Sequence, residues 1–142
     1  MKASPLAPRG DNVVHLRTRS PTHGLHVLAE WYGCPRGEAM KRAERLAQLC
    51  AQLAREARFD VVSRAFQQFE PEGVMGVVIL SDAHIAIHTW PDTGFVALDV
   101  YTCHLTPDTR QRAFEFLGKL REVLRPVWVN TSEVNRGVVD AG

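Results

Sequence analysis

The chain has 142 residues and a mass of 15.9 kDa, enough to bury the core of one domain without disulfides or metal ions. Hydrophobic residues make up 45% and charged residues 23% of it, which excludes a wholly disordered, collagenous or coiled-coil chain. Seventeen basic against sixteen acidic side chains give a net charge of +1, so no overall field draws the protein to nucleic acid or to a membrane, and we expect neither as a partner.

The first 22 residues differ in composition from the rest. They carry a net charge of +3, three prolines and no apolar period, so we interpret residues 1–22 as a flexible basic arm and residues 23–142 as the folded domain. A nucleic-acid-binding arm is the alternative interpretation. The sequence shows neither the apolar core of a secretory signal nor a run long enough to span a membrane, which predicts a cytoplasmic protein.

The apolar pattern predicts a simple order of elements in the domain. Alternation predicts a strand over about 25–32, and apolar residues at steps of three and four predict a helix over about 38–58. A second helix begins at Thr106, with proline at the first helical position and an acid in the first turn, and ends at Pro126. Further strands are expected over 59–69, 74–80, 85–90, 95–101 and 127–134.

This order predicts an α+β protein, a two-layer sandwich in which an antiparallel sheet carries two helices on one face. The three strands between residues 74 and 101 are close enough in sequence to form an antiparallel meander. The other face needs cover, because two helices cannot bury all of the large aromatic side chains Trp31, Phe66, Trp90, Phe95 and Tyr101. We therefore expect two copies to pack sheet against sheet as a homodimer, the alternative being that these side chains all pack within one chain.

Polar reactive side chains gather in one window, between Ser81 and His104. On a strand, His84 and His88 lie about 13 Å apart, too far for one zinc ion to bind both, so we expect no metal ion. Cys103 is a candidate nucleophile if it contacts His84 or His88 across neighbouring strands, whereas a buried thiol beside a hydrogen-bonded histidine is the structural alternative. The three cysteines have no CxxC spacing and are expected to be reduced, and no phosphate-binding glycine loop is present.

The longest informative stretch runs over residues 73–92, GVMGVVILSDAHIAIHTWPD, and is followed by ALDVYTC at 97–103. With HGLH at 23–26, YGC at 32–34 and RG at 136–137, it resembles the core of the short bacterial and archaeal S-adenosylmethionine decarboxylases, over about residues 23–137. The resemblance implies the fold of that family and a role related to spermidine and polyamine biosynthesis. It also implies a pyruvoyl group, which those enzymes make by self-cleavage at an internal serine and use to accept the electrons released with carbon dioxide.

The resemblance further implies roles for individual residues. Asp82 matches the acidic residue before the cleavage-site serine, His88 the histidine that assists processing, and Cys103 the thiol that donates a proton in decarboxylation. Trp90 and Asp92 match the aromatic and acidic residues beside the ligand site.

Ala83 stands where the family has its serine. A methyl group has no lone pair to attack a carbonyl, so Ala83 cannot become a pyruvoyl group, and we expect no cofactor in this chain. Met75 replaces a hydroxyl residue that is thought to help processing, and His104 replaces a small residue after the cysteine. Ser81 lies on the same strand face as Ala83 and is a substitute nucleophile, although its use would displace the reaction by about 7 Å.

Two functions follow from the resemblance. The first is a non-processing homologue that stays one chain, forms a homodimer, and binds S-adenosylmethionine or a related amine as a sensor or as the partner of an active paralogue. The second is a pyruvoyl-dependent decarboxylase of S-adenosylmethionine or of a basic amino acid, whose serine has been mutated to Ala83. Such a mutation would leave Met75 unexplained, so we favour the first. Thiol chemistry at Cys103, independent of pyruvoyl, is a third hypothesis.

Overall fold

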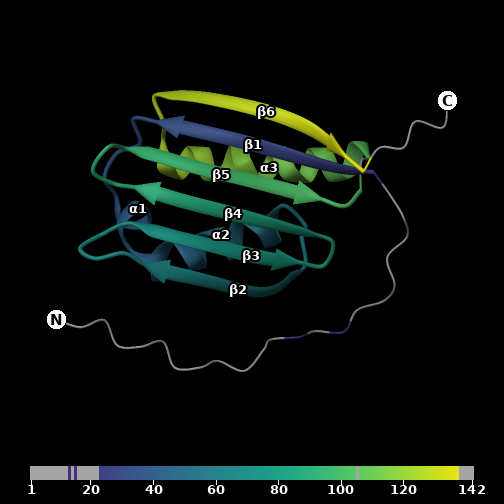
Figure 1. Ribbon diagram of the computed structural model, residues 1–142, viewed down its shortest axis with the longest axis horizontal. Coiled ribbons are helices and arrows are strands. Elements are labelled where there is room, and N and C mark those ends of the chain that lie inside the picture. Colours follow the sequence, from purple (N-terminus) through teal and green to yellow (C-terminus); the bar gives the residue numbers. More distant parts are fainter. Residues whose placement is uncertain (1–12, 14, 16–22, 105, 138–142) are drawn as a thin grey trace.

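A computed structural model describes residues 13, 15, 23–104 and 106–137 (Figure 1). Most of the expected basic arm, residues 1–22, therefore lies outside the described residues. Six strands form one antiparallel sheet with the order β2-β3-β4-β5-β1-β6. The strands are β1 Gly24–Tyr32, β2 Val61–Gln68, β3 Val74–Leu80, β4 Ala83–Trp90, β5 Phe95–Thr102 and β6 Trp128–Arg136.

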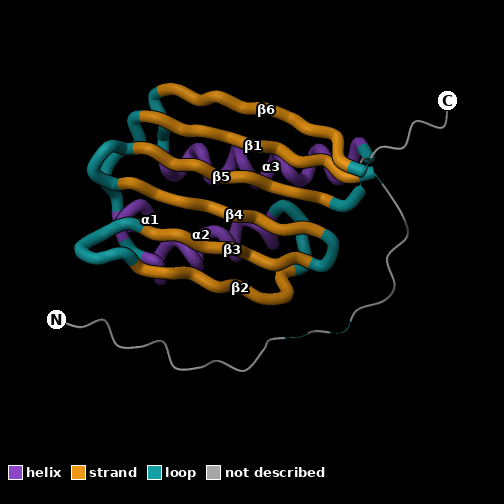
Figure 2. The backbone as a smooth tube through the Cα atoms, viewed as in Figure 1, coloured by secondary structure: helices purple, strands orange, loops and turns teal. Residues whose placement is uncertain are grey.

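The helices all lie on one face of this sheet, behind the strands in Figure 2. They are α1 Glu38–Lys41, α2 Ala43–Glu56 and α3 Pro107–Leu124. The expected α+β two-layer sandwich is thus confirmed, as is the antiparallel meander of β3, β4 and β5. The sequence pattern did not predict the place of β1, which lies between β5 and the last strand of the chain, β6.

The helix expected over 38–58 is interrupted at Arg42, whose backbone is extended with φ −117° and ψ 124°. Gln68, at the end of β2, takes over the hydrogen bonds that a continuous helix would make. Its Oε1 accepts from the Ala43 amide at 2.6 Å, and its Nε2 donates to the Lys41 carbonyl at 2.7 Å. The Gly73 amide also donates to Lys41, at 3.1 Å. The β2–β3 turn therefore docks into the break and divides the expected helix into α1 and α2.

The start of α3 follows the expected pattern. Thr106 caps the helix through a reciprocal pair of hydrogen bonds with Thr109, and Pro107 occupies the first turn. The helix ends at Leu124, because Arg125 adopts the left-handed conformation with φ 50° just before Pro126. The core between the helices and the sheet holds fully buried side chains from both layers, including Leu46, Cys50, Ile85, Ile87, Val100, Phe116 and Leu120.

The other sheet face carries no helix within the described part of the chain. Trp31 is only 3% exposed, and Phe66 packs over Gly76 towards the helices, so these two of the five aromatic residues need no second chain to bury them. The other three lie on strand positions that alternate with the buried ones and face away from the helices, as do the exposed hydrophobic side chains of Met75 and Ile79. The homodimer stays a prediction. Among the described residues, no helix is long and apolar enough to cross a membrane.

Candidate functional site

The site residues expected from the sequence fall into two groups at opposite ends of β4. Ala83 is the first residue of that strand and Trp90 the last, a separation of about 23 Å along an extended chain. One group surrounds the β3–β4 turn, and we call it the Asp82 end. The other surrounds the turn after β4, and we call it the Trp90 pocket.

The Asp82 end brings together three of the expected residues. Ala83 pairs with Thr102 on β5, and the Cys103 amide donates a 2.9 Å hydrogen bond to the Asp82 carbonyl. Ala83 is half-buried and packs against the core on the same strand face as Ile85. The backbone on both sides of the Asp82–Ala83 bond is therefore fixed by pairing with the end of β5.

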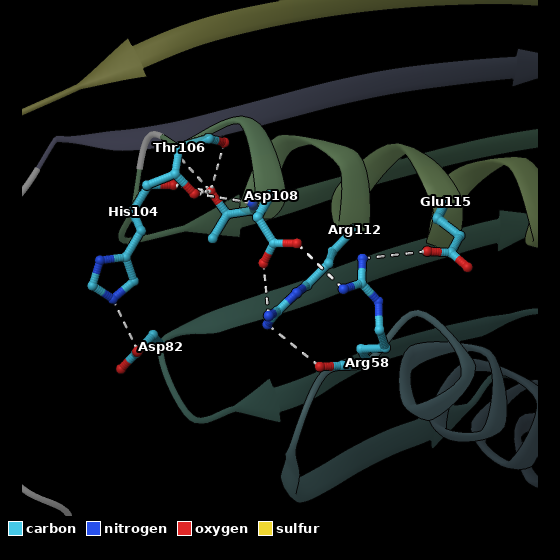
Figure 3. A network of polar contacts seen from close by, with 8 residues as sticks. Arg58, Asp82, His104, Thr106, Asp108, Arg112 and Glu115 are labelled. Carbon is cyan, nitrogen blue, oxygen red and sulfur yellow. Dashed lines mark hydrogen bonds and ion pairs between the residues drawn. The ribbon is translucent and has the colours of Figure 1, made fainter.

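His104 is a further member of this end. Its Nε2 lies 3.0 Å from Oδ2 of Asp82, and Figure 3 shows the imidazole pointing down from the start of α3 towards that carboxylate. The His104 carbonyl accepts hydrogen bonds from the hydroxyls of Thr102 and Thr109, so the residue is held through its backbone and its ring. The sequence marked His104 only as a departure from the family pattern. Its pairing with Asp82 became visible only in three dimensions.

An ion-pair network fixes the start of α3 above this end (Figure 3). Asp108 contacts Arg58, which follows α2, at 3.2 Å and Arg112 at 2.7 Å. Arg58 also approaches Glu115 at 3.9 Å. The Arg58, Asp108 and Glu115 side chains are about one-third to one-half exposed, so the network contributes little free energy, but it joins the two long helices next to the segment that carries His104.

The Trp90 pocket brings together the other expected residues. It is a cavity of about 410 Å³ whose lining includes His88, Trp90 and Asp92. The His88 and Trp90 rings stack with centroids 5.9 Å apart and an angle of 16° between the planes. Phe69 and Glu72 also line it and were missed by sequence reasoning, because they come from the turn between β2 and β3, about twenty residues earlier in the chain.

Met75 belongs to the same end of the sheet as this pocket. It pairs with His88 across β3 and β4 and is 36% exposed on the sheet face that carries no helix. Met75, which replaces an expected hydroxyl residue, is therefore the cross-strand neighbour of His88, the histidine expected to assist processing.

The structure does not bring His88 and Cys103 together within one chain. His88 pairs with Ala97 on β5, and Cys103 follows six residues later, about 20 Å along the strand. His88 is likewise about 17 Å from Ala83 along β4. His84 instead pairs with Tyr101 and approaches Asp99 at 3.5 Å. The contact between Cys103 and His88 that a nucleophilic pair would need is thus not formed within a single copy.

The cysteines differ in their surroundings. Cys34 and Cys50 are buried, and burial raises the pKa of the Cys34 thiol to about 11 and that of Cys50 to about 12. Cys103 is half-buried at the Asp82 end. The two core thiols are consequently poor nucleophiles near neutral pH.

Comparison with known proteins identifies the relatives of this chain. A family profile described as S-adenosylmethionine decarboxylase matches residues 25–137. Among the curated relatives, the S-adenosylmethionine decarboxylase proenzyme of Caldicellulosiruptor saccharolyticus is 37% identical over 117 residues, which cover 82% of this chain and 90% of the relative. The proenzyme of Syntrophomonas wolfei is 38% identical over 117 residues, with coverage of 82% and 89%.

A solved structure shows the same likeness in three dimensions. The crystal structure of the adenosylmethionine decarboxylase from Aquifex aeolicus VF5 matches with a TM-score of 0.75 and 33% sequence identity. The match covers 87% of this chain and 98% of the other.

Proposed function

The chain belongs to the S-adenosylmethionine decarboxylase family, and on that premise we propose that it is a member related to polyamine biosynthesis that does not cleave itself and that binds S-adenosylmethionine or a related amine. Ala83 carries the first part of the proposal. It follows Asp82 at the start of β4, where the family pattern has the serine that becomes the pyruvoyl group. Without a hydroxyl, no ester forms at this position and no pyruvoyl group arises from it, so the chain carries no such cofactor.

Met75 and His104 support the same proposal. A thioether at Met75 cannot donate a proton as the expected hydroxyl would. The His104 ring engages the Asp82 carboxylate, whereas a small residue after the cysteine would leave it without this partner. Three separate positions thus depart from the family pattern, although Asp82, His88 and Cys103 are retained.

The Trp90 pocket supports ligand binding. Its volume of about 410 Å³ lies within the range of small-molecule sites. Phe69 and Trp90 offer aromatic faces to a flat base or to a cation, and Glu72 and Asp92 offer carboxylates to hydroxyl or ammonium groups. S-adenosylmethionine combines a flat base, a sugar with two hydroxyls, a sulfonium cation and an amine. The aromatic faces and carboxylates of the pocket lining offer a suitable partner to each of these groups.

The separation of the Asp82 end from the Trp90 pocket supports a homodimer. Residues that the family uses together lie about 17 to 20 Å apart within one chain. Two copies packed sheet against sheet about a two-fold axis over the middle of β4 would place the Asp82 end of one copy opposite the Trp90 pocket of the other. This packing would also cover exposed hydrophobic side chains such as Met75, Ile79 and Trp90.

Mass spectrometry of the denatured protein tests the absence of self-cleavage. We expect one intact mass near 15.9 kDa after prolonged incubation. Two fragments separated by a break before Ala83, or before Ser81 if that residue substitutes, would refute the non-processing proposal. A mixture of fragments with breaks elsewhere would indicate proteolysis. Sequencing of the fragment ends distinguishes proteolysis from self-cleavage.

Calorimetric titration with S-adenosylmethionine tests the ligand. We expect saturable binding that Trp90→Ala weakens by about 10-fold or more through the loss of a stacking face. Trp128→Ala is the matched control, since Trp128 is 59% exposed and does not line the pocket. Absence of binding to S-adenosylmethionine, its decarboxylated form and simple diamines would remove this part of the proposal and leave the non-processing part intact.

The second function is a decarboxylase of S-adenosylmethionine or a basic amino acid whose serine has been mutated to Ala83. The retained Cys103 favours it, because a proton donor has a use only in an active enzyme. The codon at position 83 of the source gene decides between a natural and an introduced alanine. Pairing with an active paralogue is an extension of the first function, and co-purification of the two chains from the source cell tests it.

A further inference from the structure

Two histidines and an aspartate converge on the helix-free face of the sheet, next to the Asp82 end. His26 comes from β1, His84 from β4 and Asp99 from β5. Nε2 of His26 lies 2.8 Å, and Nε2 of His84 lies 3.5 Å, from the same oxygen of Asp99, Oδ2. One ligand atom from each residue lies within 4.8 Å of the other two. In a single copy the side chains are 19%, 43% and 28% exposed in that order, so an ion can reach them before two copies pack sheet against sheet.

The sheet holds these side chains in place. His26 and His84 both pair with Tyr101, one from each side of β5, and Asp99 lies two residues away on the same face. Both imidazoles pack on the Tyr101 ring, with centroid distances of 5.5 and 5.6 Å. The two imidazole centroids are 6.2 Å apart although their strands are separated by β5. Three interior strands therefore preorganise the cluster without any loop.

We propose that His26, His84 and Asp99 form a binding site for a divalent transition-metal ion of the zinc class. Two imidazoles and one carboxylate are the donor set that zinc and its neighbours accept, and they leave one coordination position open. Ligand atoms about 2 Å from a tetrahedral zinc ion lie about 3.3 Å from one another, close to the spacing around Asp99. The proposal uses residues of a single chain, and in the proposed homodimer the ion would lie between the two sheets.

This site differs from the one that sequence reasoning considered and excluded. That reasoning tested His84 with His88, which lie too far apart on one strand. The structure joins His84 instead to His26 and Asp99, which are 73 residues apart in the chain. The expectation of no metal ion considered only His84 and His88, and the present proposal departs from it.

Arg136 competes with a metal ion for His26. Its Nη1 lies 3.0 Å from Nδ1 of His26, and a guanidinium only donates, so Nδ1 accepts and Nε2 carries the proton that it gives to Asp99. A metal ion at Nε2 requires that this proton leave, which is easier when Nδ1 takes up a proton and Arg136 moves away. The positive guanidinium also repels a divalent cation. Removing Arg136 should therefore strengthen metal binding.

Calorimetric titration of the untagged, chelator-treated full chain with zinc chloride is the first test, and visible absorption on addition of Co²⁺ is the second. We expect one Zn²⁺ per chain and cobalt d–d bands typical of nitrogen and oxygen ligands. Asp99→Asn and His84→Ala are expected to weaken binding by about 10-fold or more. His15→Ala, which removes an exposed histidine outside the cluster, should leave the affinity unchanged.

The Arg136→Ala variant distinguishes loss of metal ligands from loss of the fold. A variant that misfolds also loses its metal, but misfolding cannot strengthen binding, so a several-fold tighter affinity for Zn²⁺ in Arg136→Ala supports the site directly. Lack of saturable Zn²⁺ binding in the unmodified chain would overturn the proposal. So would binding that Asp99→Asn leaves unchanged, or an affinity that Arg136→Ala fails to raise.

Discussion

The hydroxyl of Thr89 donates a 2.7 Å hydrogen bond to the carbonyl of Met40 in α1. The same oxygen accepts the amide of Val74 at 2.9 Å, so one buried side chain joins the short helix to β3 and β4. Thr89 is 4% exposed and lies in the lining of the Trp90 pocket between His88 and Trp90. The bond therefore fixes the strand from which both pocket rings project.

Replacing Thr89 by valine keeps the shape of the side chain and removes both hydrogen bonds. Because the Val74 amide and the Met40 carbonyl would lose this buried partner, we expect Thr89→Val to lower the free energy of unfolding by about 1–3 kcal/mol. Urea denaturation measures the change. Thr89→Ser keeps the hydroxyl and is expected to cost less than the valine; equal losses in the two variants would show that the methyl group, not the hydroxyl, matters.

Gly76 has no room for a side chain. A Cβ atom there would lie 2.1 Å from the Phe66 ring, so Gly76→Ala must displace that ring and is expected to cost about 1–3 kcal/mol of folding free energy. Thermal unfolding measures it, and adding Phe66→Ala to the same chain should make the alanine at position 76 nearly neutral. Gly118→Ala is the matched control: α3 has open space at this position, and alanine is expected to stabilise the helix there by about 0.5–1 kcal/mol.

The three cysteines should react with a thiol reagent at very different rates. Cys103 is half-buried, whereas Cys34 and Cys50 are buried and their pKa values are raised to about 11 and about 12. At pH 8 we expect Cys103 to be labelled first and Cys50 last, with peptide mapping by mass spectrometry as the readout. Labelling of all three at one rate in the native protein would contradict the buried positions of Cys34 and Cys50.

The raised thiol pKa values also set the direction of a pH effect on stability. A thiol whose pKa is higher in the folded than in the unfolded chain stabilises the fold below the unfolded value of about 9. This contribution is lost as the pH rises from about 9 to about 12. We expect the free energy of unfolding to fall over that range, and Cys50→Ala to reduce the fall; a pH profile of the variant parallel to that of the unmodified chain would contradict the assignment to Cys50.

The sequence predicted the elements because each leaves a local periodic signature. The alternation that ends at Trp31 and Tyr32, and the cap at Thr106, are properties of neighbouring residues. The break at Arg42 was not predictable in this way, because the side chain that replaces the helical hydrogen bonds, Gln68, lies 25 residues from Ala43. Local patterns report hydrogen bonds within an element and not those that another element supplies.

The candidate site shows the same limit. Family resemblance located Asp82, His88 and Cys103 along the chain, but only the strand register showed that His88 and Cys103 lie at opposite ends of the sheet. The cluster around Asp99 left no trace in the sequence, because its members are brought together by the pairing of β1, β5 and β4 and not by their spacing along the chain. A function that needs His88 beside Cys103 therefore needs a second copy, which is open to a direct test.

Self-cleavage should be restorable between two different chains and not within one. The first chain carries Ala83→Ser and His88→Ala, so it regains the hydroxyl but lacks the assisting imidazole. The second carries Met75→Ser and keeps Ala83 and His88, so it supplies the imidazole and a neighbouring hydroxyl but has no nucleophile. If the Asp82 end of one copy faces the Trp90 pocket of the other, only the mixed dimer assembles a complete site.

We expect each chain to stay intact when expressed alone and the first chain to split before position 83 when the two are co-expressed, as judged by the masses of the denatured chains. Replacing the second chain by unmodified protein, which keeps Met75, should slow the cleavage. A third chain with Ala83→Ser and Met75→Ser together shows whether the restored groups can work at all. If that chain cleaves while the co-expressed pair does not, the site is assembled within one copy and the sheet-to-sheet arrangement is wrong. In a face-to-face dimer His88 would act on the partner chain, because about 17 Å of strand separates it from position 83 of its own chain.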